Sequence, residues 1–110
     1  MMGANCVVVW TTIGSGTDGQ TLASILVNER LAACVNVLPE MESTYHWKGG
    51  VESERERQIV IKTTAERLPA LQARVHELHP YEVPEFIVLP VISGSEKYLA
   101  WIRESTAKTG

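Results

Sequence analysis

His79 is the residue of this sequence whose type and position best suit chemistry. An expected helix must end there, because Pro80 follows and the residue before a proline is pushed out of the helical conformation. Tyr81 and Glu85 lie in the same short segment. Imidazole is a good ligand for copper, and a carboxylate can complete such a site. We therefore predict His79 as a metal ligand, with a structural alternative in which its ring hydrogen-bonds a backbone carbonyl and fixes the loop.

A second group of side chains predicts a binding cleft. The group combines aromatic rings, carboxylates and one lysine, which suit a small anion or metabolite. Its members come from two expected strands and from the segment after His79, and we expect them to meet between subunits. Burial of the lysine away from any cleft would contradict this hypothesis. The predicted cleft residues are Tyr45, Trp47, Glu56, Lys62, Tyr81 and Glu85.

The sequence Gly-Ser-Gly-Thr-Asp-Gly at residues 14–19 matches the GxGxxG pattern of dinucleotide-binding proteins. That fold needs strands and helices repeated in parallel order, whereas this chain next turns back through a tight hairpin. We therefore expect a flexible turn before a helix whose first amides attract an anion weakly. No serine, histidine and aspartate can be assigned to a triad, and no nucleophile stands beside an obvious base. The sequence thus predicts a protein that is not an enzyme.

Composition bounds the classes of partner. The chain has 110 residues, 45% of them apolar, which suits one hydrophobic core, so we expect residues 1–110 to form a single domain. A formal charge of -3 argues against nucleic acid as a partner. No apolar run is long enough to span a bilayer, so no membrane is expected either. The two cysteines match no disulfide or zinc spacing, which favours a reducing, cytoplasmic setting.

Two long extended segments at residues 33–64 must position much of this chemistry. They fold back on each other at Lys48-Gly49-Gly50. A strand of fifteen residues reaches about 50 Å, whereas a domain of this size is only about 34 Å across. Part of the hairpin must therefore project and pair with something, so we predict an oligomerisation arm. Pro39 cannot donate to a strand ladder and predicts a bulge.

The remaining elements complete an alternating order. Residues 5–13 are β-branched and predict a strand buried on both faces. Thr17 and Gln20 have capping-box spacing, which predicts a helix to about Leu31. The order strand, helix, strand, strand, helix, strand, helix predicts an α+β ferredoxin-like sandwich of the split βαβ type. In this fold the helices cover one face of an antiparallel sheet, and the other face needs cover. The later expected elements are a helix at 67–78, a strand at 86–89 and a helix at 96–105 capped near Ser95.

Several ordered blocks resemble the CutA divalent-cation-tolerance family over nearly the whole chain. They are residues 29–37 (ERLAACVNV), 43–49 (STYHWKG), 61–64 (IKTT), 79–85 (HPYEVPE) and 98–101 (YLAW). The resemblance implies a ferredoxin-like homotrimer whose hairpins pair between subunits, a cytoplasmic location and a link to copper or another divalent cation. Copper proposals in this family draw on a cysteine late in the first strand and on histidines before the Pro-Tyr pair. Here Thr11 and Leu78 stand at two of those positions, and only His79 matches.

These observations favour a homotrimeric metal-binding or scaffolding protein linked to divalent-cation tolerance. One alternative is a PII-like trimeric sensor that binds a nucleotide or a small organic anion in clefts between subunits. A second is a small enzyme on the same ferredoxin-like fold, since a fold does not determine a function. A histidine or arginine poised over the glycine-rich turn would favour the enzyme.

Overall fold

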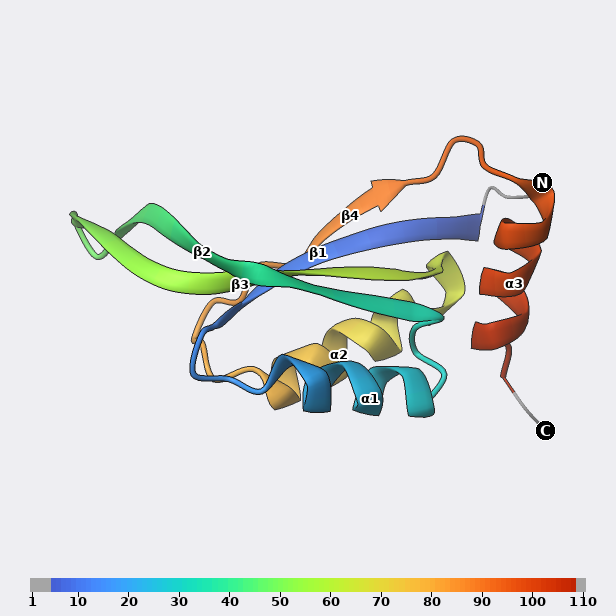
Figure 1. Cartoon of the computed structure of the whole chain (residues 1–110), viewed down its shortest axis with the longest axis horizontal. Helices are drawn as coiled ribbons and strands as arrows, with labels where there is room; N and C mark the ends of the chain where they lie inside the picture. The colour runs from blue at the N-terminus through green and yellow to red at the C-terminus, as the bar shows by residue number, and fades with distance from the viewer. Residues whose placement is uncertain (1–4, 109–110) are drawn as a thin grey trace.

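The computed structural model describes residues 5–108, which form one sheet and three α-helices (Figure 1). The order of strands and helices is the one predicted, with a short 3-10 helix added before the second α-helix. The elements are β1 (Cys6–Gly14), α1 (Gly19–Asn28), β2 (Cys34–Trp47), β3 (Gly50–Thr64), η2 (Ala65–Arg67), α2 (Leu68–Leu78), β4 (Ile87–Pro90) and α3 (Glu96–Thr106).

The four strands form an antiparallel sheet in the order β2-β3-β1-β4, which confirms the predicted mixed α+β class. Helices α1 and α2 cover one face of this sheet (Figure 1). Helix α3 differs from the prediction, because it stands at the end of the sheet. There its Leu99 and Ile102 pack against Cys6 and Ala33.

The core lies between the sheet and the helix pair. Val9 of β1 is paired with Ile61 of β3, and both side chains are fully buried. Because side chains alternate along a strand, the same face of the sheet carries the other inward residues two positions away. Full burial of each large aliphatic side chain contributes about 1.5–3 kcal/mol to folding. The cluster comprises Val9, Ile13, Leu22, Leu26, Leu31, Ala32, Ile59, Ile61, Leu71 and Val75.

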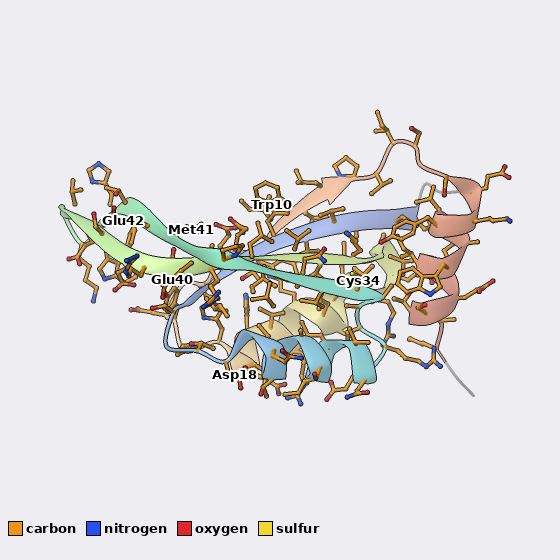
Figure 2. The ribbon with its side chains drawn as sticks, viewed as in Figure 1. Trp10, Asp18, Cys34, Glu40, Met41 and Glu42 are labelled. Atoms are coloured by element: carbon orange, nitrogen blue, oxygen red, sulfur yellow. The ribbon has the colours of Figure 1, made fainter. Side chains whose placement is uncertain are left out.

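Within residues 5–108, the opposite face of the sheet meets a helix only at one end, where α3 packs against Cys6. Trp10 is 41% exposed and projects on the side away from α1 and α2 (Figure 2). Its partner in the adjacent edge strand is Ile87, which is 50% exposed. The prediction that the first strand is buried on both faces holds for Cys6 and Thr12 of this face but is wrong at Trp10, because no helix packs over that part of the sheet.

The β2–β3 hairpin projects beyond the core and extends the molecule to 44 Å along its longest axis (Figure 1). Lys48 and Gly49 both have positive φ, 50° and 84°, as the two residues of a type I′ turn require. The pairing of β2 with β3 shifts between Val37 and Glu40, around Pro39. The predicted bulge is therefore confirmed.

The first helix begins and ends differently from the prediction. Its N-cap is Asp18, not Thr17. Its C-terminus is a Schellman motif, in which Leu31 N–H bonds Leu26 O and Arg30 N–H bonds Val27 O. Arg30 takes the left-handed conformation, with φ of 60°, where glycine is usual. Because no glycine marked this end, the helix was predicted three residues too long.

Candidate functional site

His79 is held at the C-terminus of α2 by hydrogen bonds at both ring nitrogens. Its backbone is extended, as expected before Pro80. Nδ1 accepts from the Tyr81 amide at 3.1 Å, so Nε2 carries the proton and donates it to the carbonyl of Thr12. The side chain is only 8% exposed. The neutral ring therefore has no lone pair left over for a metal ion in this arrangement.

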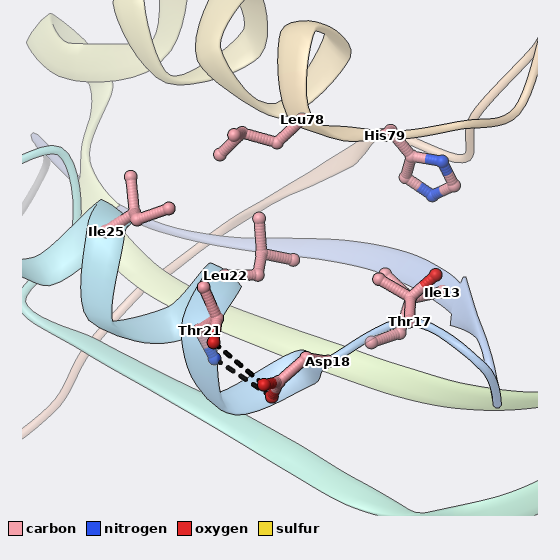
Figure 3. Close-up of a pocket in the computed structure, with 8 residues that line it drawn as sticks. All are labelled: Ile13, Thr17, Asp18, Thr21, Leu22, Ile25, Leu78 and His79. Carbon is pink, nitrogen blue, oxygen red and sulfur yellow. Dashed lines mark hydrogen bonds between the residues drawn. The ribbon is translucent and has the colours of Figure 1, made fainter.

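The histidine also borders a small cavity of about 230 Å³ between the ends of α1 and α2 (Figure 3). Thr17 and Asp18 of the glycine-rich turn line the same cavity. The Asp18 carboxylate accepts hydrogen bonds from the amides of Gln20 and Thr21, and the Thr21 hydrogen bonds lower the pKa of Asp18. The helix amides that were predicted to attract an anion are thus occupied by a carboxylate of the chain itself. His79 faces this turn without a free nitrogen to act as a base.

The other positions that bear on metal binding do not join His79 in a cluster. Thr11 is fully buried in β1, and its hydroxyl has no hydrogen-bond partner among the residues that the structure describes. Cys6 is buried beside α3. Cys34 is the first residue of β2, at the end of the strand away from the hairpin turn (Figure 2). Among residues 5–108, no three histidine, cysteine, aspartate or glutamate side chains are arranged to hold a metal ion. The arrangement therefore favours the structural alternative for His79, and its role as a metal ligand stays a prediction.

A larger cleft of about 920 Å³ lies between the outer half of the hairpin and the loop at residues 79–85. Strand pairing explains its hairpin wall, because Met41 lies opposite Glu56 and Tyr45 opposite Glu52, so these side chains share one face. The structure brings five of the six predicted cleft residues together here. Those five are Tyr45, Trp47, Glu56, Tyr81 and Glu85.

Lys62, the sixth predicted residue, does not line this cleft. It lies six residues beyond Glu56 along β3, about 20 Å away at the rise of a strand. Its ammonium group lies 6.0 Å from the centre of the Tyr98 ring of α3. Alternation along β3 puts Lys62 on the same side of the sheet as Glu56, but distance along the strand separates them. Within one chain Lys62 thus lies apart from this cleft, and its place in a cleft between subunits stays a prediction.

Tyr81 connects the loop to the hairpin. Its phenol donates to Glu56 Oε2 at 2.8 Å and lies 3.4 Å from Glu54 Oε1. Burial and the hydrogen bond to Glu56 raise the pKa of Tyr81, because both favour the neutral phenol. Glu56 itself is only 6% exposed. The innermost carboxylate of the cleft thus depends on this one phenol.

Gln58, which was not among the predicted site residues, makes a second connection between the loop and the sheet. Its side-chain amide donates to the backbone carbonyl of Thr11 at 2.8 Å and to Glu85 Oε2 at 3.0 Å. Gln58 follows Glu56 by two residues on the same face of β3. Its position between the charged and the apolar half of that strand could have indicated this role from the sequence.

The charge of the cleft is one-sided. Five carboxylates line it, and no lysine or arginine does so among the described residues. Arg55 and Arg57 point to the other face of the hairpin, where Arg55 pairs with Glu40 at 3.7 Å and Arg57 donates to the carbonyl of Leu38. Desolvation, followed by repulsion from Glu54, raises the pKa of Tyr45 at the cleft wall. The cleft lining of one chain therefore favours a cation over the predicted anion. The five carboxylates that line the cleft are those of Glu52, Glu54, Glu56, Glu82 and Glu85.

The fold and the cleft together define a small α+β protein with a projecting hairpin and an acidic cleft at its base. No helix within residues 5–108 has the length and apolar character needed to cross a membrane. The family model described as CutA1 divalent ion tolerance protein matches residues 7–105. The chain therefore belongs to the CutA1 family.

Individual relatives agree with this assignment. The divalent-cation tolerance protein CutA of Thermus thermophilus is 46% identical over 99 residues, which cover 90% of this chain and 96% of that protein. The chloroplastic protein CutA of Arabidopsis thaliana is 45% identical over 91% of this chain, which spans only 55% of that protein.

Solved structures show the same fold. The crystal structure of CutA1 from Oryza sativa has a TM-score of 0.90 and 40% identity, covering 96% of this chain and 97% of that one. The Thermus thermophilus protein has a TM-score of 0.89 and 45% identity, covering 93% and 99%. The family assignment thus rests on both sequence and structure.

Proposed function

We propose that this protein acts in divalent-cation tolerance as a cytosolic homotrimer. In this proposal it is a metal-binding or scaffolding protein and not an enzyme. The observation that carries the proposal is the cleft between the hairpin and the 79–85 loop, which five carboxylates line without a lysine or arginine among the described residues. The names of the relatives, divalent-cation tolerance proteins, support the same role.

The donor chemistry of the cleft suits a divalent cation held loosely by one chain. Carboxylate and phenol oxygens are the donors that the cleft supplies, and such oxygens suit hard cations. Because no three acidic, histidine or cysteine groups converge within residues 5–108, one chain does not complete a coordination shell. We expect groups from a neighbouring copy, or water, to complete it. Harder cations are therefore tested beside copper, the ion that the family resemblance implies.

Trimer formation is supported by two surfaces of the single chain. The hairpin projects from the core, with one edge of β2 unpaired along its length. The sheet face opposite α1 and α2 carries exposed apolar side chains, including Trp10, Ile87 and Leu89. A ferredoxin-like homotrimer would cover this face and pair the hairpins between subunits. Native mass spectrometry tests it against the monomer mass of 12.2 kDa, and a stable monomer would contradict it.

Calorimetry with Cu²⁺, Zn²⁺ and Mn²⁺ tests the cleft. We expect the double variant Glu54→Gln/Glu56→Gln to weaken cation binding at least tenfold, because it removes two lining charges. The matched control is Glu40→Gln/Glu42→Gln, which removes two charges from the other face of the same hairpin. Equal losses in both variants would show a general charge effect and would contradict a site in the cleft.

A second candidate function is a PII-like sensor of a small organic molecule. The cleft volume of about 920 Å³ and its aromatic walls, Tyr45 and Trp47, favour such a ligand. Lys62 of a neighbouring copy would then have to supply the positive charge that the cleft lining of one chain lacks. A thermal-shift screen with nucleotides and carboxylic acids separates the two functions. Stabilisation by an organic anion, with no response to metals, would favour the sensor.

A further inference from the structure

Gln58 joins the loop at residues 79–85 to the paired strands β1 and β3. It belongs to β3, it donates to the carbonyl of Thr11 in β1, and it donates to Glu85 in the loop. The side-chain amide nitrogen has two hydrogens, and these two bonds use both of them. The orientation of the amide is therefore determined, and with it the position of the Glu85 carboxylate.

The donor that holds Glu85 is neutral. Tyr81 holds Glu56 with another neutral donor, the phenol. Within residues 5–108, no arginine, lysine or histidine nitrogen forms an ion pair with Glu56 or Glu85. Both carboxylates are thus kept in place without neutralisation of their charge. A lysine at position 58 could hold Glu85 equally well, but it would cancel the charge that attracts a cation.

We propose that Gln58 is a positioning residue of the cleft, which holds Glu85 toward the ligand and leaves its charge uncompensated. This inference rests on the proposed function, because it assumes a cation as the ligand. Groups that orient a ligating carboxylate change metal affinity about 10–100-fold when they are removed. Gln58 is accordingly expected to affect both affinity and the kind of ligand accepted.

Two substitutions separate positioning from charge. Gln58→Met has a similar length and no donor, so Glu85 loses its anchor. Gln58→Lys keeps a donor within reach of Glu85 but adds a positive charge. The control is Gln72→Met, the same change at an exposed position of α2 outside the cleft. Binding of Mn²⁺ by calorimetry and the melting temperature are measured for each protein.

We expect Gln58→Met to weaken Mn²⁺ binding about tenfold and Gln58→Lys to remove it, with Gln72→Met unchanged. We also expect Gln58→Lys to melt at a higher temperature than Gln58→Met, because it keeps a hydrogen bond to Glu85. Wild-type affinity in Gln58→Lys, with melting temperature and affinity falling together in Gln58→Met, would show a purely structural role and overturn the inference. Failure of the wild type to bind Mn²⁺, Cu²⁺ or Zn²⁺ would instead overturn the proposed function and this inference with it.

Discussion

The phenol oxygen of Tyr81 lies 2.8 Å from Oε2 of Glu56, and this hydrogen bond ties the loop after α2 to the outer half of the hairpin. The two residues are 25 positions apart in the sequence. Next to Tyr81, the ring of His79 accepts from the Tyr81 amide and bonds the carbonyl of Thr12. The cleft is therefore built by a chain of contacts that begins at a buried histidine and ends at a buried carboxylate.

Removal of the Tyr81 hydroxyl should destabilise the protein. Tyr81→Phe leaves Glu56 buried without its donor, which costs about 1.5–3 kcal/mol for a bond to a charged group. Urea unfolding at pH 7 measures this change. The control is Tyr98→Phe, which alters a 43% exposed tyrosine of α3. Equal stability of the two variants would show that the Tyr81–Glu56 bond contributes nothing.

The same phenol should make stability sensitive to alkaline pH. The pKa of Tyr81 is raised, by burial first and by Glu56 second, so the folded protein holds this proton more tightly than the unfolded chain does. Its contribution is complete below pH of about 10, the ordinary tyrosine pKa, and is lost as the pH rises above that value. Between pH 8 and 11, the free energy of unfolding should fall more steeply for the wild type than for Tyr81→Phe. Parallel curves would contradict the raised pKa.

Thr11→Val should stabilise the protein by about 1 kcal/mol, because the buried Thr11 hydroxyl has no hydrogen-bond partner. Thr63→Val is the matched control in β3. Thr63 is equally buried, but its hydroxyl donates to the carbonyl of Leu31 at 2.8 Å. The same substitution there should destabilise by about 1 kcal/mol. Thermal and urea unfolding of both variants measure the two signs, and a loss of stability in Thr11→Val would point to an unseen partner.

Substitution of His79 should affect stability more than metal affinity. His79→Ala removes one buried and one partly buried hydrogen bond, at about 1 kcal/mol each. His79→Asn can keep an acceptor for the Tyr81 amide and should recover part of this loss. Unfolding free energy and Cu²⁺ calorimetry are measured together. Loss of Cu²⁺ binding at unchanged stability would establish His79 as a ligand instead.

Asp18 should contribute stability that disappears in acid. Hydrogen bonds from Thr21 lower the pKa of Asp18 in the folded protein. The contribution is therefore present above the ordinary aspartate pKa of about 4 and is lost as the pH falls through the lower folded value. Asp18→Ala should lower the melting temperature at pH 7 and have a smaller effect near pH 2. A constant difference between the two proteins at all pH values would contradict this.

Local patterns were enough to predict much of the architecture. The order of strands and helices, the bulge at Pro39 and the end of α2 before Pro80 all follow from side-chain period and proline chemistry, which act over a few residues. The end of α1 did not follow, because Arg30 takes a conformation that its residue type does not signal.

Tertiary structure decided the site. Residue types suggested that Lys62 and Glu56 act together, but six residues of β3 separate them within one chain. The 79–85 loop brings Glu85 to Gln58 instead. The sequence by itself determined which side chains could do chemistry and which element each one occupies. Only the folded chain decided which of them meet, because strand register and loop path bring together residues far apart in sequence. It also decided that both nitrogens of His79 are occupied by backbone groups.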